Sequence, residues 1–469
     1  MAFFHGIKVT EKQTQIVAPV QVDSAVQVVV GLAPVNMGDL ADPLAPQIAY
    51  SYDEAVQKMG MSADHLTYTI CESIKLSFAN YNVSPLIMIN VLDPSKHKEQ
   101  KTSVSVSMLE GKAELTEEGV IPSSLQLTQT EQALQVGTDY NLSFDTDGKA
   151  VIERIEGGKI ASDTASLTAT YDVLDPTTVE DADILAGVAK IREVYPRFGI
   201  VPGTLIVPGY SGKPAIYNAM TSKTDTLNGV FRYHCLVDLD TETVTAYDQA
   251  QTEKNKNNFT HENSSLFWPM VRVGEEMYHF SAAAAALIAD TDYNNDGVPY
   301  VSLSNKSLKI SGLCLADGSE VILDMEQANL LNSQGINTTI NMNGWKAWGN
   351  RTACYPGNTD IKDCFIPCRR MYNWWANQFI LSYFAKVDDP INKRLIESIV
   401  DSENIKGNAW KQRYQVAEAK LVFDSEDNPV TDLINGIVRI KMLFSPYPPA
   451  EQILATVEYD TSALQSALE

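Results

Sequence analysis

The chain has 469 residues, of which 44% are hydrophobic and 9% aromatic, and its net charge is -23. This composition excludes wholesale disorder, and the length exceeds what one hydrophobic core usually organises, so we expect about two to four domains. The acidic charge argues against nucleic-acid binding, which needs clustered Lys and Arg, and no apolar stretch approaches the roughly 20 residues of a membrane helix.

The charge is unevenly distributed along the chain. Residues 346–469 contain 14 Lys+Arg and 16 Asp+Glu, a net of -2, so the other 345 residues carry -21. A near-neutral C-terminal part on an acidic body indicates one face made for packing and another for water. Six cysteines are spread along the chain without a CxxC pair, and we expect them to be reduced thiols. The first twelve residues lack the pattern of a secretion signal.

The first part of the chain predicts an arm followed by an α/β fold. Residues 1–22 alternate apolar and polar positions without a helical period, as at Ile7 and Val9, so they predict an extended arm that must be held by something else. Apolar runs at 26–30 and 85–91 predict buried strands, with helices at 51–60 and 66–81 between them. This order of elements predicts a partly parallel sheet.

Residues 94–176 have a different character. Short alternating stretches such as 103–108 and 165–170 recur between turn signals, which is typical of a small antiparallel β-domain. The segment begins after Asp93-Pro94 and ends at Asp175-Pro176, so we interpret it as an insertion.

The α/β pattern resumes at Thr177, which forms a capping-box pattern with Glu180. Further strands are predicted at 204–207 and 235–237. A long helix is predicted after about residue 369 and a second one near 391–400. Two alternating strand patterns close the chain, at 438–444 and 453–459, with three prolines between them.

No segment carries the residues of a catalytic or ligand site. The Gly209–Pro214 turn lacks the first glycine and the final hydroxyl of a phosphate loop. The loop that starts at Asp292 opens like a calcium loop, but Leu303 stands where the closing carboxylate belongs. Three late cysteines have no histidine to complete a zinc site. We therefore expect no catalytic residue, no metal and no cofactor.

Several motifs in the second half need another explanation. Asn329–Asn332 and Gly335–Thr338 are followed by the pentapeptide Trp348-Gly349-Asn350-Arg351-Thr352 and by the pair Arg369-Arg370. Near the end stands Pro446–Ile453, with the pattern Pro-x-x-Pro-Ala-Glu-x-Ile. In these motifs, and in the N-terminal His5-Gly6-Ile7 and Val28–Pro34, the chain resembles the contractile tail sheath family. The resemblance covers both ends and most of 177–469, and it is weakest in 94–176.

The resemblance implies a function and a set of partners. The chain would be a structural subunit, not an enzyme, which polymerises around an inner tube and contracts to drive that tube through a target cell envelope. Its partners would be further copies of itself in stacked hexameric rings, the tail tube protein, and baseplate and tail terminator proteins, without direct nucleic-acid contact or membrane insertion. The particle would be a virion tail or a phage-tail-like particle assembled in the bacterial host cytoplasm. Its terminal arms would add strands to sheets of neighbouring subunits.

The predicted fold is multidomain, α/β plus β, with a discontinuous α/β body, an inserted antiparallel β-domain and strand-like terminal arms. The arm 1–22 and residues 346–469 would form an inner domain, 23–93 and 177–345 a middle α/β domain, and 94–176 an outer β-domain. We expect the subunit interfaces and their structural supports to include Ile7, Val9, Trp348, Asn350, Arg351, Arg369, Arg370, Pro449, Glu451, Ile453 and Val457.

Two questions stay open at the level of sequence. The arginines at 351, 369 and 370 fit a subunit or tube interface and an intramolecular ion pair equally well, because a guanidinium offers five fixed N–H donors. The alternatives to a sheath are another tubular or surface assembly protein and an α/β enzyme whose site escapes recognition.

Overall fold

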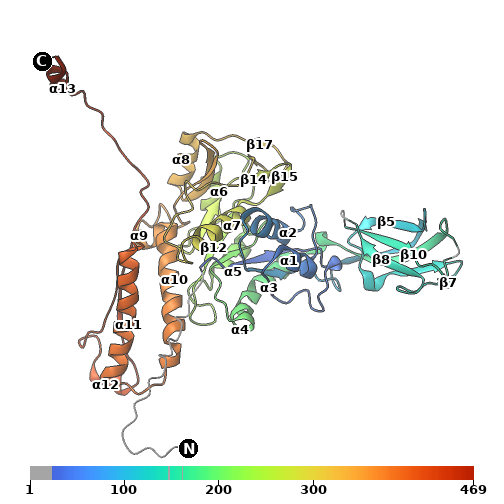
Figure 1. Ribbon diagram of the computed structural model, residues 1–469, viewed down its shortest axis with the longest axis horizontal. Coiled ribbons are helices and arrows are strands. Elements are labelled where there is room, and N and C mark those ends of the chain that lie inside the picture. Colours follow the sequence, from blue (N-terminus) through green and yellow to red (C-terminus); the bar gives the residue numbers. More distant parts are fainter. Residues whose placement is uncertain (1–23, 146–147, 161, 469) are drawn as a thin grey trace, which may run out of the picture.

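The computed structural model describes residues 24–145, 148–160 and 162–468, so the predicted arm 1–22, with Ile7 and Val9, lies outside the described residues. The molecule is elongated (Figure 1). An α/β body lies in the middle, a β-rich segment projects at one end, and a helical segment with the C-terminal tail lies at the other.

The body is built on an eight-stranded sheet in the order β19-β18-β13-β12-β11-β1-β3-β2. The six inner strands run parallel, and the two edge strands run antiparallel to their neighbours. The apolar runs predicted as strands lie here because a parallel sheet covered by helices is buried on both faces. The strands are β1 (Gln27–Gly31), β2 (Gln47–Ala49), β3 (Leu86–Asn90), β11 (Thr204–Ile206), β12 (His234–Asp238), β13 (Ser264–Phe267), β18 (Ile336–Asn341) and β19 (Trp345–Trp348).

Helices from both parts of the body pack with this sheet into one hydrophobic core. They are α1 (Tyr52–Met59), α2 (Thr69–Ile74), which continues as a π-helix (Lys75–Tyr81), α3 (Asp181–Ala189), α4 (Val194–Phe198), α5 (Pro214–Thr221), α6 (Ala250–Lys256), α7 (Phe280–Tyr293) and α8 (Met325–Ser333). A small antiparallel sheet of β14 (Met270–Val273), β15 (Glu276–Tyr278), β16 (Gly312–Cys314) and β17 (Glu320–Val321) lies beside them.

The β-rich segment contains two antiparallel sheets and a hydrophobic core of its own. It leaves the body after β3 and returns at α3, and in Figure 1 it extends away from the rest of the chain. One sheet has the order β4-β10-β6-β7 and the other β5-β9-β8. The strands are β4 (Lys98–Ser107), β5 (Lys112–Glu118), β6 (Gln126–Gln129), β7 (Gln132–Ala133), β8 (Tyr140–Phe144), β9 (Lys149–Arg154) and β10 (Ser166–Leu174).

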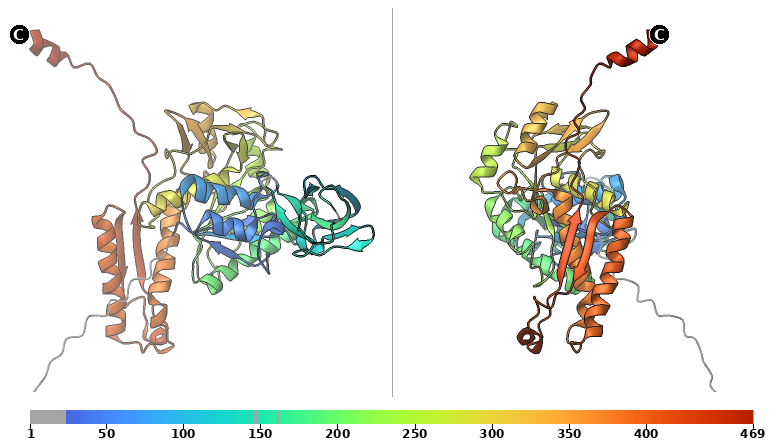
Figure 2. Two further views of the ribbon diagram at one scale, coloured as in Figure 1. Left: turned by 45° about the vertical axis from the view of Figure 1, so that its right-hand side comes forward. Right: turned by 90° about the vertical axis from the view of Figure 1, so that its left-hand side faces the viewer.

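The helical segment follows the last strand of the body. It consists of two long helices, a two-stranded antiparallel sheet, a short helix between its strands, and a tail that ends in another helix. Figure 2 shows this tail leaving the molecule and running away from the body. The elements are α9 (Ile361–Cys364), α10 (Ile366–Tyr383), α11 (Lys393–Gln412), β20 (Val416–Val422), α12 (Val430–Ile434), β21 (Lys441–Pro446) and α13 (Thr461–Leu468).

Two helix predictions need correction. Thr177 does not start the helix after the β-rich segment, because Asp175 accepts hydrogen bonds from its N–H and hydroxyl and holds it in a turn. The box forms three residues later, where the Glu180 N–H donates to Asp183. The second late helix runs to Gln412 instead of ending near residue 400, because β20 packs along its second half.

The prediction of a final strand at 453–459 is wrong for the isolated chain. These residues form neither helix nor strand, because no strand of the described chain runs alongside to pair with their backbone groups. The helix after them, α13, was not predicted. It begins at Thr461, and the Asp460 carboxylate accepts a hydrogen bond from the Ala463 N–H.

Candidate assembly surface

The helical segment is organised around a cluster of tryptophans. The Trp374 and Trp410 rings lie 5.0 Å apart between centroids, and Trp375 meets Trp410 edge-on at 6.1 Å. The Trp375 indole N–H and the Tyr383 hydroxyl each donate to the buried Glu403 carboxylate at 2.8 Å. The aromatic residues of α10 therefore form the core that holds α11 in place, as expected for a stripe at helical spacing.

Helix α11 packs very closely on β20. A Cβ atom added to Gly407 would lie 2.0 Å from the Ala419 carbonyl oxygen, so only glycine fits at this position. Strand β20 pairs with β21, and in the described residues neither strand has a second neighbour. Side chains occupy part of the outer edges: Asn404 on α11 bonds to the N–H and carbonyl of Leu421, and the Tyr372 hydroxyl donates to the Phe444 carbonyl. No strand of the described residues pairs with either outer edge, so another strand could be added there.

The tail after β21 exposes apolar side chains without any cover. Ile453 is 87% exposed and Val457 is 96% exposed, and Leu454 and Tyr459 are similarly open. More than half of the large apolar side chains that the described chain exposes lie between residue 384 and residue 468. A concentration of this kind marks a surface made for contact with other molecules.

A single ion pair holds the base of the tail. Arg351 Nε donates to Glu451 Oε1 at 3.0 Å, and a second guanidinium nitrogen contacts the other carboxylate oxygen. The guanidinium also lies over the rings of Phe365 at 3.9 Å and Tyr355 at 4.3 Å. The structure thus joins two of the sequence motifs, Trp348–Thr352 and Pro446–Ile453.

Arg370 forms a buried ion pair across the junction between the helical segment and the body. Arg370 Nη1 donates to Asp292 Oδ1 at 3.2 Å, and its Nη2 contacts the other carboxylate oxygen and the Ser24 carbonyl. The Ser24 hydroxyl donates to the same carboxylate at 2.8 Å. Asp292, the first residue of the calcium-like loop, is therefore engaged by an arginine.

Arg369 is also paired within the chain. Its Nη1 donates to Asp363 Oδ1 at 3.0 Å and its Nη2 to Asn373 at 3.1 Å. Although burial alone would raise the pKa of Asp363, hydrogen bonding from Lys362 and the charge of Arg369 lower it. Of the two interpretations left open for this arginine pair, the isolated chain displays the intramolecular one. An interface role for either residue stays a prediction.

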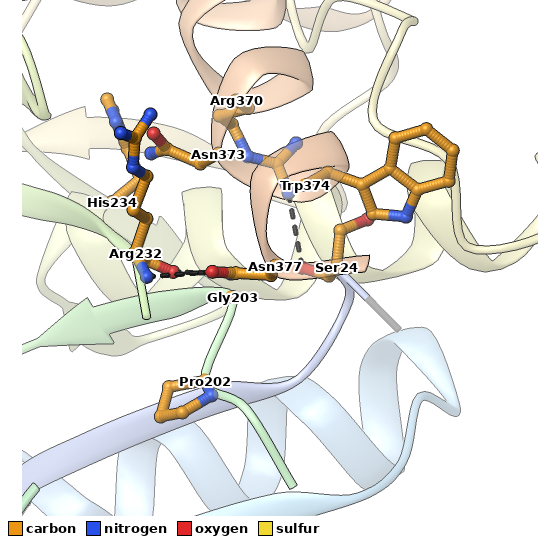
Figure 3. A pocket seen from close by; sticks show the side chains of 9 residues that line it. All are labelled: Ser24, Pro202, Gly203, Arg232, His234, Arg370, Asn373, Trp374 and Asn377. Atoms are coloured by element: carbon orange, nitrogen blue, oxygen red, sulfur yellow. Dashed lines mark hydrogen bonds between the residues drawn. The ribbon is translucent and has the colours of Figure 1, made fainter. Parts of the chain in front are cut away.

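A small pocket lies beside this junction (Figure 3). Its volume of about 20 Å³ is room for about one water molecule, far below the roughly 300–1,000 Å³ of a ligand site. Asn377 from α10 exchanges two hydrogen bonds with the backbone of Arg232, and His234 contacts the Ser265 hydroxyl at 2.8 Å. Burial and the nearby charges of Arg370 and Arg369 hold the pKa of His234 well below its usual value. These polar groups tie α10 to the body.

A larger cleft, of about 600 Å³, lies at the carboxyl ends of β11 and β12. Two of its titratable groups, Asp238 and His279, are engaged at the start of α7. Asp238 accepts from the Ser281 N–H at 2.7 Å, and Glu72 accepts from the His279 N–H at 2.8 Å and contacts its ring nitrogen at 3.0 Å. Although burial alone would lower it, the charges of Glu72 and Asp238 raise the pKa of His279 to about 9.

The Trp348–Thr352 motif forms the corner between the edge strand and α9. The Trp348 indole N–H donates to Asn329 at 3.1 Å, Asn350 accepts from the Ser302 hydroxyl, and Thr352 donates to the Asp363 carbonyl at 2.6 Å. These hydrogen bonds fix the corner so that Arg351 faces the tail.

The predicted site residues thus fall into three groups. Arg351 and Glu451 meet, and Arg369 and Arg370 are buried in separate ion pairs. Trp348 and Asn350 support the corner, while Pro449, Ile453 and Val457 lie on the tail, where the last two are almost fully exposed. Sequence reasoning missed the acidic partners Asp292, Asp363 and Glu403, because no fixed spacing links them to their arginines or tryptophan.

The three late cysteines form one buried cluster. Cys354, Cys364 and Cys368 are free thiols, and burial raises their pKa, that of Cys368 to about 12. Within residues 24–145, 148–160 and 162–468, no group of three or more His, Cys, Asp or Glu side chains is arranged to hold a metal ion. In the same ranges, no helix combines the length and the apolar character needed to cross a membrane.

Comparison with known proteins finds relatives of this chain. No protein-family model matches the chain. The tail sheath protein of Burkholderia phage BcepMu is 26% identical, with 98% of each chain covered, and that of Escherichia phage P2 is 26% identical over 65% of this chain and 74% of its own.

Solved structures share the fold. They include the sheath of the PVC extracellular contractile injection system in the contracted state (TM-score 0.58, 14% identity, 99% of both chains) and the sheath tail protein of Desulfitobacterium hafniense (TM-score 0.54, 11% identity, 95% of this chain and 96% of that one). Full-length similarity to a named tail sheath protein thus accompanies the fold of solved sheath subunits.

Proposed function

We propose that the chain polymerises around an inner tube as the subunit of a contractile sheath and contracts to drive that tube through a target cell envelope. The observation that carries this proposal is the exposed apolar tail together with a two-stranded sheet that has no further strand at either outer edge in the described residues. Both features lack a partner in the isolated chain, and repeated copies of the same chain supply one for each.

Strand addition is the contact that we propose between subunits. The 453–459 segment alternates in sequence like a strand and remains extended and exposed. It would gain backbone hydrogen bonds at the edge of β20 or β21 of a neighbouring subunit. Residues 1–22 would act in the same way from the other end of the chain. Stacked hexameric rings linked by such arms would form the sheath.

The three-part division of the chain gives each part a place in the sheath. Residues 346–469 with 1–22 would form the inner domain facing the tube, 23–93 with 177–345 the middle domain, and 94–176 the outer domain. The near-neutral charge of 346–469 supports its inward place, and the separate core of the β-rich segment supports its outer one. Replacing residues 95–175 by a short Gly/Ser linker should preserve folding by circular dichroism, and an unfolded product would contradict this division.

Contraction needs no enzymatic activity in this proposal. The buried Arg370–Asp292 pair links α10 to the body, so the body and helical segment would move as one rigid unit, while the tail beyond Glu451 would act as a flexible tether. An extended lattice would relax to one with more contacts as rigid subunits rotate on their tethers. Tail tube, baseplate and terminator proteins would be the other partners, and a similar chain (TM-score 0.60) in the anti-feeding prophage baseplate structure supports the baseplate contact. Assembly would take place in the bacterial host cytoplasm.

Negative-stain electron microscopy of the purified chain tests the proposal. We expect striated tubes or stacked rings at micromolar concentration. A protein that stays monomeric under all assembly conditions, or one with robust hydrolase activity lost on a single substitution in the cleft near His279, would contradict it.

A further inference from the structure

An apolar groove lies at the far end of the helical segment. It has a volume of about 590 Å³ and forms where the first turns of α11 meet the end of β20 and α12. Ile391 is 38% exposed there. The apolar side chains that line the groove are Ile391, Ile396, Val400, Phe423 and Leu433.

The C-terminal helix α13 carries the complementary feature. Leu464 and Leu468 are separated by one helical turn and therefore share a face, and they are 50% and 80% exposed. The helix touches no other element of the described chain closely enough to cover these leucines, and Figure 1 shows it at the end of the projecting tail. The same chain thus presents an unfilled apolar groove and an uncovered apolar helix face.

The register of the β20–β21 sheet shows where the groove and the start of the tail lie relative to each other. In the β20–β21 pair, Val422 lies opposite Lys441, and Val416 lies opposite Pro446. The groove lies beyond Val422, whereas the tail leaves after Pro446, at the opposite end of the sheet. The ion pair of Glu451 with Arg351 holds the tail base further toward the body. The tail therefore starts by running away from the groove of its own chain.

The tail can reach the groove of a neighbouring copy without turning back on itself. The extended segment 453–459 has seven residues, and β20 also has seven residues. A tail that is added along the edge of a neighbour's sheet from the Pro446 end would therefore span the sheet and place α13 directly at the groove. We propose that the C-terminal helix α13 of one copy docks its Leu464–Leu468 face into the α11–α12 groove of another copy. The proposal rests on the proposed strand addition and extends it from backbone pairing to a side-chain anchor.

Disulfide trapping in mixed assemblies tests which copy fills the groove. One chain carries Leu464→Cys and a second, tagged chain carries Ile396→Cys, and the mixture is assembled and then oxidised. Because all six native cysteines are buried, the engineered thiols should dominate the reaction. We expect a covalent tagged–untagged dimer. Replacing Ile396→Cys by Ile405→Cys, an exposed position on the other side of α11, should give none.

A second measurement does not depend on cross-linking. The double substitution Leu464→Ser with Leu468→Ser should raise the concentration needed for assembly by ~10-fold or more, because two leucines lose their buried site. The melting temperature of the monomer should not change, since these leucines are exposed in the isolated chain.

The outcomes separate this inference from the proposed function. Tubes that form normally from the double variant, together with no dimer between the Leu464→Cys and Ile396→Cys chains, would overturn the docking while leaving the sheath role intact. A cross-link that forms only within one chain carrying both substitutions would also overturn it, because the groove would then hold the chain's own helix. If the parent chain forms no tubes at all, the proposed function itself fails.

Discussion

The junction under α10 and the tail after β21 both contain acidic and apolar side chains, but these side chains are partnered in opposite ways. At the junction, Arg369 and Arg370 are buried against Asp363 and Asp292. In the tail, Glu451 is paired with Arg351 at the base, and the large apolar residues that follow it face solvent. The comparison indicates that the junction stabilises the subunit, while the tail is reserved for other copies.

The largest effect on the monomer should come from Arg370→Ala. The substitution leaves the Asp292 carboxylate buried without its cation, which typically destabilises a protein by about 3–5 kcal/mol. Thermal unfolding followed by circular dichroism measures the loss. The matched control is Arg439→Ala, which breaks an exposed pair with Asp432 and should lower stability by less than about 1 kcal/mol. Equal melting temperatures for the two variants would show that the junction is not the stabilising element.

Gly407→Ala should cause the second-largest loss of monomer stability. Its new Cβ would press on the Ala419 carbonyl, and such overpacking typically destabilises by about 1–3 kcal/mol. Chemical denaturation of the monomer gives the value. Gly436→Ala is not a suitable control, because that glycine has a positive φ, so Ser398→Ala on the exposed side of α11 is used instead. A Gly407→Ala protein as stable as the parent would show that α11 and β20 separate easily.

The body, unlike the tail, should respond to mild alkaline pH. His279 has a folded pKa of about 9, above its ordinary 6.5, so its pairing stabilises fully below pH 6.5 and is lost as pH rises through 9. Relative to His279→Gln, the parent should therefore lose ~1–3 kcal/mol between pH 6.5 and 9. Parallel denaturation curves at the two pH values measure this difference. A gap between parent and variant that stays constant with pH would refute the coupling to Glu72 and Asp238.

The smallest effect on the monomer should come from removing residues 453–469. Their apolar side chains are exposed, so the melting temperature should stay within about 1 °C of the parent, since exposed termini contribute few buried contacts. Assembly should be abolished, as seen by sedimentation and microscopy. Glu451→Gln, which weakens only the tail base, should lower assembly less. A truncated chain that still forms normal tubes would contradict the claim that the tail serves assembly.

The sequence predicted the body well because its signals are local. Apolar runs at 26–30 and 85–91 became β1 and β3, and the helix predicted at 51–60 became α1. The sequence could not predict the partners of the arginines, because Arg370 lies 78 residues from Asp292 and no sequence pattern fixes that pairing. Asp292 itself was noticed only as part of an incomplete calcium loop.

The tail shows a different limit of sequence reasoning. The alternation at 453–459 is a strand pattern, yet a strand forms only where another strand offers its edge, and in the described chain no strand pairs with this segment. The final helix has one apolar face over only two turns, which is too short a signal to find beside a strand pattern.

Hydrogen exchange of the tail tests the central claim most directly. Peptides that cover 453–459 should exchange fully within seconds in the monomer, because these residues belong to no helix or strand, and should become protected by at least ~100-fold in assembled tubes, where a neighbour's strand supplies hydrogen-bond partners. Protection already present in the monomer, or rapid exchange that persists in the tubes, would contradict the account.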